Sequence, residues 1–249
     1  MGRVEMDLVI PLNNKSNDKD LELKYALRSI EKNMPFVRNL VLVGWRPNWL
    51  HGDIIHIPCE DMYKNNKLKN QNILQKILIA CADEKLSDNF IFTNDDIFVL
   101  QEVTELPNYF HGTLNGYITD GKSHYKPYRD AIFASERYLI ERNLHTLHYD
   151  IHTPIIYNKH KFTEIFKDIK HEVVIKSIYG NTVNKNYVSL VDNKIFKHYN
   201  PEEIIEQNKD QKFLSVNDNA FDTNMKCYLD RLFPKKSKYE KPPPDYVKQ

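Results

Sequence analysis

The sequence contains few cysteines, few glycines and no long apolar run. Among its 249 residues are three cysteines, Cys59, Cys81 and Cys227, and no CxxC pair. This spacing excludes a disulfide scaffold and a zinc site built from cysteines, and it favours a reducing compartment. No stretch approaches the roughly 18 apolar residues of a membrane span, and the N-terminus does not resemble a signal peptide. We therefore expect a cytoplasmic protein without a membrane span.

The sequence also lacks an excess of charge. With 35 basic and 34 acidic residues, the formal net charge is +1. A protein whose main partner is nucleic acid or an anionic membrane usually carries a clear basic excess. A nucleic-acid acceptor would need a local basic groove, and the composition gives that possibility little support. The hydrophobic content of 41% is ordinary for a globular protein of one large domain.

Apolar strands alternate with helical patterns in the first half of the chain. We expect strands over 6–12, 39–43 and 53–58 and helices over 23–34 and 65–83. This order predicts an α/β fold with a mostly parallel central sheet flanked by helices. Residues 1–234 are expected to form a single domain, regular over 1–105 and less regular over 106–234. Gly180 and Asn181 are expected to form a turn. The last segment, 235–249, contains three consecutive prolines and is expected to be an extended tail that lacks core-forming residues.

The most informative stretch runs from Phe90 to Leu100, where Asn94, Asp95 and Asp96 separate two apolar runs. Two adjacent carboxylates beside a buried strand are costly, because each raises the pKa of the other and burial opposes ionisation. The arrangement is reasonable if the strand ends at a cleft and the carboxylates share Mg²⁺ or Mn²⁺. The alternative is a plain turn in which both side chains bond nearby backbone.

Other polar residues are candidates for the same site because ligands bind outside the carboxyl ends of parallel strands. Asn13 follows the first strand. Lys69, Asn72 and Lys76 share one helical face and would hold a phosphate or a base, or else form an ordinary solvated face.

The second half contributes two histidines and an aspartate. His152 lies in a loop before Pro154, where it would donate hydrogen bonds or move a proton, or serve only structurally. A zinc site with His148 is a weaker alternative, because Pro154 opposes a continuous helix. His198 is a further histidine, and Asp218 follows a second apolar run as a base or as a helix cap.

The order of these motifs resembles the Stealth family of sugar transferases and, more broadly, glycosyltransferases of the GT-A fold. Residues 23–100 are similar to the family's second conserved region, with Asn94-Asp95-Asp96 as its metal motif. The segments 152–154 and 213–219 are similar to the third and fourth regions. The first region is represented only by residues 7–10, and Lys176 stands near the place of an expected arginine.

This resemblance implies a Rossmann-like GT-A fold, with a nucleotide-sugar-binding half (1–105) and an acceptor-side half (106–234). It implies a metal-dependent glycosyltransferase of polysaccharide biosynthesis that moves a sugar from a nucleotide sugar, such as a UDP-sugar, to a hydroxyl of a glycan or other polymer. Mn²⁺ or Mg²⁺ would bind Asp95 and Asp96. The implied catalytic residues are Asp95, His152 and Asp218, and the implied donor-binding residues are Asn13, Lys69, Asn72, Lys76, Asn94 and His198. The alternatives are Stealth-type transfer of a whole sugar-1-phosphate, as in capsular polysaccharide phosphotransferases, and a non-catalytic carbohydrate- or nucleotide-binding module.

Overall fold

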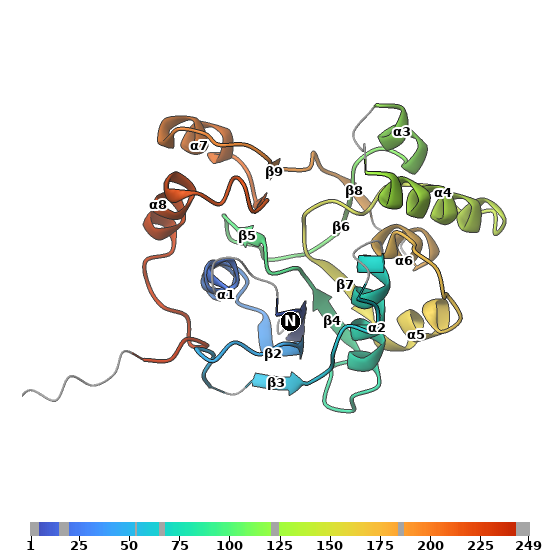
Figure 1. Ribbon diagram of the computed structural model, residues 1–249, viewed down its shortest axis with the longest axis horizontal. Helices are drawn as coiled ribbons and strands as arrows, with labels where there is room; N and C mark the ends of the chain where they lie inside the picture. Colours follow the sequence, from blue (N-terminus) through green and yellow to red (C-terminus); the bar gives the residue numbers. More distant parts are fainter. Residues whose placement is uncertain are drawn as a thin grey trace, which may run out of the picture.

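A computed structural model describes residues 5–14, 20–52, 54–64, 68–120, 125–183 and 187–242. Its centre is a five-stranded sheet of order β3-β2-β1-β4-β7, in which β7 pairs antiparallel with β4 and the other neighbours pair in parallel. The strands are β1 (Met6–Leu12), β2 (Val37–Gly44), β3 (Ile54–Ile57), β4 (Asn89–Phe92) and β7 (Ile155–Asn158). The predicted mostly parallel sheet is confirmed (Figure 1).

Helices cover both faces of this sheet, which explains why β1 is apolar at consecutive positions. Leu8 and Ile10 point to the face covered by α1 (Leu21–Asn33). Val9 points to the opposite face, where it packs in one cluster with residues of α2 (Lys69–Cys81). Side chains alternate along a strand, so a central strand buried on both sides must be apolar at every position.

After β4 the chain adds two small sheets, of strand order β5-β10-β9 and β6-β8, and a set of helices. The strands are β5 (Ile97–Val99), β6 (Asn108–Phe110), β8 (Tyr187–Ser189), β9 (Lys194–Ile195) and β10 (Phe213–Val216). The helices are α3 (Leu114–Thr119), α4 (Lys126–Ile140), α5 (Lys159–Phe166), α6 (Ile175–Val183), α7 (Pro201–Asn208) and α8 (Thr223–Leu232). These short strands agree with the predicted less regular half.

One segment that the sequence predicts as a Gly-Asn turn is a helix. Residues 180 and 181 belong to α6, where the Asn181 amide donates to the carbonyls of Ser177 (2.7 Å) and Leu147 (2.8 Å). Gly180 lies against Tyr149, and a Cβ at this position would come within 2.6 Å of the ring. Gly180 therefore allows close packing against Tyr149, and Asn181 forms side-chain hydrogen bonds within a helix. The turn prediction is wrong.

The C-terminal segment is also better ordered than its prolines suggest. Tyr239 is buried in the core, and Glu240 forms two 2.7 Å bonds with the Arg28 guanidinium of α1. We call residues 237–241 the C-terminal clasp. The expected lack of core-forming residues is thus wrong for the clasp, while 243–249 lie outside the described residues.

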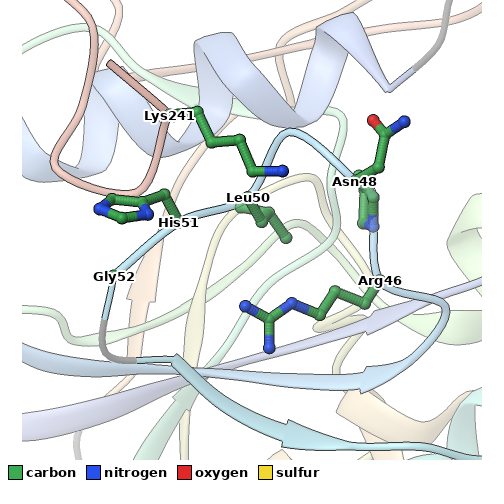
Figure 2. A pocket seen from close by; sticks show the side chains of 7 residues that line it. Arg46, Asn48, Leu50, His51, Gly52 and Lys241 are labelled. Atoms are coloured by element: carbon green, nitrogen blue, oxygen red, sulfur yellow. The ribbon is translucent and has the colours of Figure 1, made fainter.

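Lys241 of the clasp lines a shallow pocket of about 760 Å³ together with residues 46–48 and 50–52. Figure 2 shows that the side chains of Arg46 and Lys241 reach this pocket from opposite sides.

Within the described part of the chain, no helix is both long enough and apolar enough to cross a membrane.

Candidate active site

The Asn94-Asp95-Asp96 motif forms the turn that joins two sheets. β4 ends at Phe92, and β5 begins at Ile97 in the sheet with β10. Both strands are buried, so the polar residues between them are fixed from both ends. The turn lies at the carboxyl end of a parallel strand, which is where α/β proteins bind ligands. The predicted position of the motif at a strand end is confirmed.

Asp96 is held by two donors on one oxygen and by none on the other. Its Oδ2 accepts from Lys194 Nζ (3.2 Å) and from Ser215 Oγ (3.0 Å). Its Oδ1 is buried and has no hydrogen-bond partner among the described residues. A buried carboxylate oxygen without a partner is costly, so this atom is suited to a cation or a donor that arrives with a ligand.

The two carboxyl groups of the motif differ in pKa. Burial, with the charge of Asp96 added to it, raises the pKa of Asp95 to about 6. Burial also acts to raise the pKa of Asp96, but the ammonium of Lys194, followed by His152 and the hydroxyl of Ser215, lowers it below its usual range. Neighbouring carboxyl groups that share a site separate in this way, and a bound cation would favour ionisation of both.

His152 lies on the other side of Lys194. Its backbone N–H donates to Asp192 Oδ1 (2.8 Å), and its Nδ1 is 2.7 Å from Asp192 Oδ2. Its Nε2 is 3.1 Å from Lys194 Nζ. An ammonium group can only donate, so Nε2 accepts and Nδ1 carries the proton toward Asp192. Asp192, His152, Lys194 and Asp96 thus form a continuous polar chain of four side chains.

Asp192, which accepts from the His152 ring, has a lowered pKa and is therefore ionised near pH 7. Its burial acts to raise the pKa, but the hydrogen bonds and charge of His152, with a contribution from the charge of Lys176, lower it below its usual range. A carboxylate that holds the Nδ1–H of a histidine fixes the ring orientation and leaves Nε2 to take up a proton.

The polar chain borders a cleft of about 570 Å³. The lining combines lysines and acidic groups with aromatic rings. The polar lining residues include Lys69, Asn70, Asn94, Asp150, His152, Glu172, Lys176 and Lys194, and the aromatic ones are Phe92, Tyr117, Tyr125, Tyr128 and Phe196. The cleft thus offers a ligand both charged groups and flat apolar surfaces.

Two of the tyrosines that line the cleft are held in place by contacts with neighbouring side chains. Tyr117 stacks on His148 with ring centroids 4.4 Å apart, and the Tyr128 hydroxyl donates to Asp150 at 2.8 Å. Burial lowers the pKa of His148 to about 4, so its ring is neutral near pH 7. A neutral, stacked His148 is a packing residue and does not support the zinc alternative. The described residues contain no cluster of three His, Cys, Asp or Glu side chains that could hold a metal.

Three of the predicted site residues line this cleft, namely Lys69, Asn94 and His152. Asp95 and Asp96 directly follow Asn94 and are not among the lining residues, although Asp96 contacts the lining residue Lys194. Two others have structural contacts instead. Lys76 is buried, and its ammonium donates to Leu12 O and contacts Asp61 Oδ1, each at 2.7 Å. Asn72 bonds both the backbone N–H (2.9 Å) and the carbonyl (2.7 Å) of Tyr63. Both residues therefore support the loops around the site, and of the three residues predicted to share a helical face only Lys69 lines the cleft.

The remaining predicted residues are outside the lining that the structure describes. Asn13 is exposed directly after β1, at the same sheet edge as the motif. His198 Nδ1 contacts Asp222 Oδ2 (2.8 Å) near the start of α8. Asp218 follows β10, whose antiparallel register pairs Ser215 with Ile97, so the chain after β10 runs back toward Asp95. These three assignments stay predictions.

Lys194 and Asp192 were not predicted from the sequence, and Lys176 was noted only because it stands near the place of an expected arginine. Each takes its place through partners that are distant in the chain, such as the 98 residues between Lys194 and Asp96. Ser215 had a usable signal, since it is a polar residue inside an otherwise apolar strand that directly precedes a predicted site residue.

Comparison with known proteins gives a family match for part of the chain. Residues 16–116 match the family model for Stealth protein CR2, conserved region 2. This part of the chain is therefore similar to the second conserved region of Stealth proteins. This region contains the Asn94-Asp95-Asp96 turn and ends before His152.

Two relatives of this Stealth region are bacterial. The chain is 32% identical over 103 residues to capsular polysaccharide phosphotransferase WcwK of Streptococcus pneumoniae, covering 38% of this chain and 30% of that protein. It is 28% identical over 185 residues to a capsular polysaccharide phosphotransferase of Neisseria meningitidis serogroup B, covering 66% of this chain and 48% of that protein. The matched part is thus less than half the length of either relative.

A solved structure shows the fold of the whole chain. The crystal structure of galactosyltransferase LgtC in complex with donor and acceptor sugar analogs has a TM-score of 0.50 over 97% of this chain and 99% of that one, at 10% identity. The predicted GT-A fold is confirmed.

Proposed function

We propose that the chain is a transferase that uses a nucleotide sugar and passes a sugar-1-phosphate to an acceptor hydroxyl. The observation that carries this proposal is the polar chain, in which the Nε2 of His152 and the ammonium of Lys194 meet beside Asp96. A base and a fixed cation at one point suit attack on phosphorus, because the cation stabilises charge on the phosphoryl oxygens while the base takes the proton of the nucleophile. The phosphotransferase names of the two bacterial relatives support the same reaction.

In this mechanism His152 is the general base. Its Nε2 takes the proton of the acceptor hydroxyl, whose oxygen forms a bond to the phosphorus next to the sugar. The bond between that phosphorus and the bridging oxygen of the diphosphate breaks, and a nucleoside monophosphate leaves. Asp192 holds the Nδ1–H and stabilises the imidazolium that forms. Lys194 must release Nε2 for this step, and a phosphate oxygen offers it a new partner.

Asp95 and Asp96 fit a divalent cation. A cation would give the buried Oδ1 of Asp96 a partner that it lacks among the described residues. It would also favour the ionised form of Asp95, whose pKa is raised by burial and by Asp96. Mg²⁺ and Mn²⁺ commonly take one or two carboxylates and complete their coordination with substrate phosphates. When bound, Mn²⁺ or Mg²⁺ would neutralise charge on the diphosphate.

Donor and acceptor would occupy different parts of the cleft. We assign Lys69 and Asn94 to the donor, with Asn13 at the same sheet edge. The aromatic rings of Tyr117 and Tyr125 in the lining suit the flat face of a glycan acceptor. The polymer class and the cytoplasmic location expected from the sequence stay predictions.

A second candidate is transfer of the sugar alone, which the sequence resemblance favoured because the first Stealth region is poorly matched. The carboxylate pair supports it, since a cation bound there would stabilise a departing nucleoside diphosphate as well.

The identity of the released nucleotide separates the two candidates. The purified chain is incubated with Mn²⁺ and a panel of nucleotide sugars, and products are followed by ³¹P NMR and mass spectrometry. We expect a nucleoside monophosphate and a sugar-1-phosphate, with water as a slow acceptor, and loss of both products in His152→Gln. A nucleoside diphosphate with free sugar would favour the second candidate. Neither product, with no nucleotide binding, would contradict both.

A further inference from the structure

Lys176 is a buried lysine in the first turn of α6, at the floor of the cleft. Its side chain is among the least exposed of the charged groups, with the residue 4% exposed. Its ammonium donates to the carbonyl oxygens of Ile151 and Thr153, each at 2.8 Å. These two carbonyls belong to the residues on either side of His152.

Lys176 contacts both ends of a tight turn that has His152 at its centre. The backbone N–H of Thr153 donates to Ile151 O at 2.9 Å, so His152 is the central residue of a three-residue turn. Lys176 bonds the carbonyl at each end of that turn, while Asp192 bonds the backbone N–H at its centre. The backbone that carries His152 is therefore fixed by side chains on two sides.

This position is unfavourable for a lysine on general grounds. Burial lowers the pKa of Lys176, and a cation near the N-terminus of a helix opposes the helix dipole. Asp150, Asp192 and Asp96 favour its charge from a distance, and no ion pair within 4 Å is found among the described residues. Unfavourable groups of this kind are concentrated where function requires them.

We propose that Lys176 is a positioning residue whose ammonium holds the His152 turn in the orientation that the transfer step needs. Lys176 acts through the two carbonyls and does not touch the reacting atoms. The proposal rests on the proposed role of His152 as the base, and it predicts a defect in turnover that leaves the affinity for the donor unchanged.

The first test compares Lys176→Met with Lys170→Met, an exposed control in the loop before α6. Methionine has a similar length and no donor, so we expect a folded protein in which turnover falls about 100-fold while the donor KM stays within about twofold. The control should match wild type. If Lys176→Met does not fold, Lys176→Ala is assayed with and without propylamine, which should restore turnover where neutral propanol does not.

The second test reads the histidine directly and does not depend on activity. In protein labelled with ¹⁵N-histidine, the His152 signals, assigned from the His152→Gln variant, should show a proton on Nδ1 in wild type and a mixture of tautomers in Lys176→Met. Unchanged signals, or unchanged turnover in a folded Lys176→Met, would overturn the proposal. Absence of turnover in wild type, with the expected change in tautomer, would instead reject only the proposed function.

Discussion

Lys194 contacts two groups that a substrate would also need, the Oδ2 of Asp96 and the Nε2 of His152. Its ammonium offsets the negative charge beside the carboxylate pair, which otherwise would repel a diphosphate. A donor that brings its own cation would replace Lys194 at Asp96 and leave the ammonium free for a phosphate oxygen. The same shift would uncover His152, so in the proposed function a single lysine would link donor binding to exposure of the proposed base.

Asp7 shows that a buried aspartate in this chain can be structural. It lies at the amino end of β1, away from the site, and accepts from Arg38 at 2.9 and 2.7 Å, from Asn39 at 2.9 Å and from the Ser87 N–H at 2.9 Å. Burial alone would raise its pKa, but these hydrogen bonds lower it below the usual range. The ionised Asp7 therefore links β1, β2 and the segment before β4.

Asp7 gives a prediction for stability against pH. A carboxyl group whose pKa is lower in the folded state adds stability above its unfolded pKa of about 4, and this stability is lost as pH falls through the folded value. Asp7→Asn should lower the free energy of unfolding at pH 7 by about 2–3 kcal/mol and flatten the acid dependence, as measured by urea denaturation. The exposed control Glu84→Gln should change neither, and an unchanged acid dependence in Asp7→Asn would contradict this account.

At the scale of elements, α6 joins the cleft to the core. It carries Lys176 at its start and Gly180 near its end, where the ring of Tyr149 would lie 2.6–2.8 Å from an added Cβ. Tyr149 is itself buried, at 2% exposure, so the ring has little room to shift. The helix thus packs close to the loop segment that precedes the His152 turn because residue 180 has no side chain.

Gly180→Ala is expected to destabilise the protein despite the better helix propensity of alanine. The propensity gain is about 1 kcal/mol, and forcing an atom into a packed contact costs about 1–3 kcal/mol. We expect a net loss of about 1 kcal/mol in thermal or chemical denaturation. Gly116→Ala in α3, where the nearest atom is the exposed Thr113 hydroxyl, should stay within about 0.5 kcal/mol of wild type. Equal stability of the two variants would contradict the packing argument.

The elements that the sequence predicts well are those whose signal is local. β1, α1 and the Asn94-Asp95-Asp96 turn each show apolar spacing or polar residues at a strand end, within one short window. The turn predicted at Gly180-Asn181 is wrong because the roles of these residues depend on partners distant in the chain, Tyr149 and Leu147. Local patterns carry no information about such contacts.

The same limit applies to the site. His152 was identifiable because it lies in a loop with a following proline. Asp192 and Lys194 were not, because their contacts with His152 span 40 and 42 residues. Lys76 is the opposite case, a residue that the local pattern assigned to a phosphate. Its ammonium instead contacts the carbonyl of Leu12 and the carboxylate of Asp61.

At the scale of the whole molecule, the site exists because two sheets meet. The parallel sheet places the aspartate turn at the end of β4, and the small β5-β10-β9 sheet brings Ser215 and Lys194 to Asp96. The part of the chain that matches the Stealth region contains Asp95 and Asp96, and the part after it contains His152 and Lys194. Neither half alone contains the complete polar chain.

The central claim is that this junction is one active centre for a nucleotide sugar. The most direct test is the rate of donor consumption with Mn²⁺ by wild type, Asp96→Asn and the exposed control Asp168→Asn, with folding checked by circular dichroism. We predict that Asp96→Asn lowers the rate by about 100- to 1,000-fold and that Asp168→Asn matches wild type. A folded Asp96→Asn variant with the wild-type rate would contradict the assignment of this site.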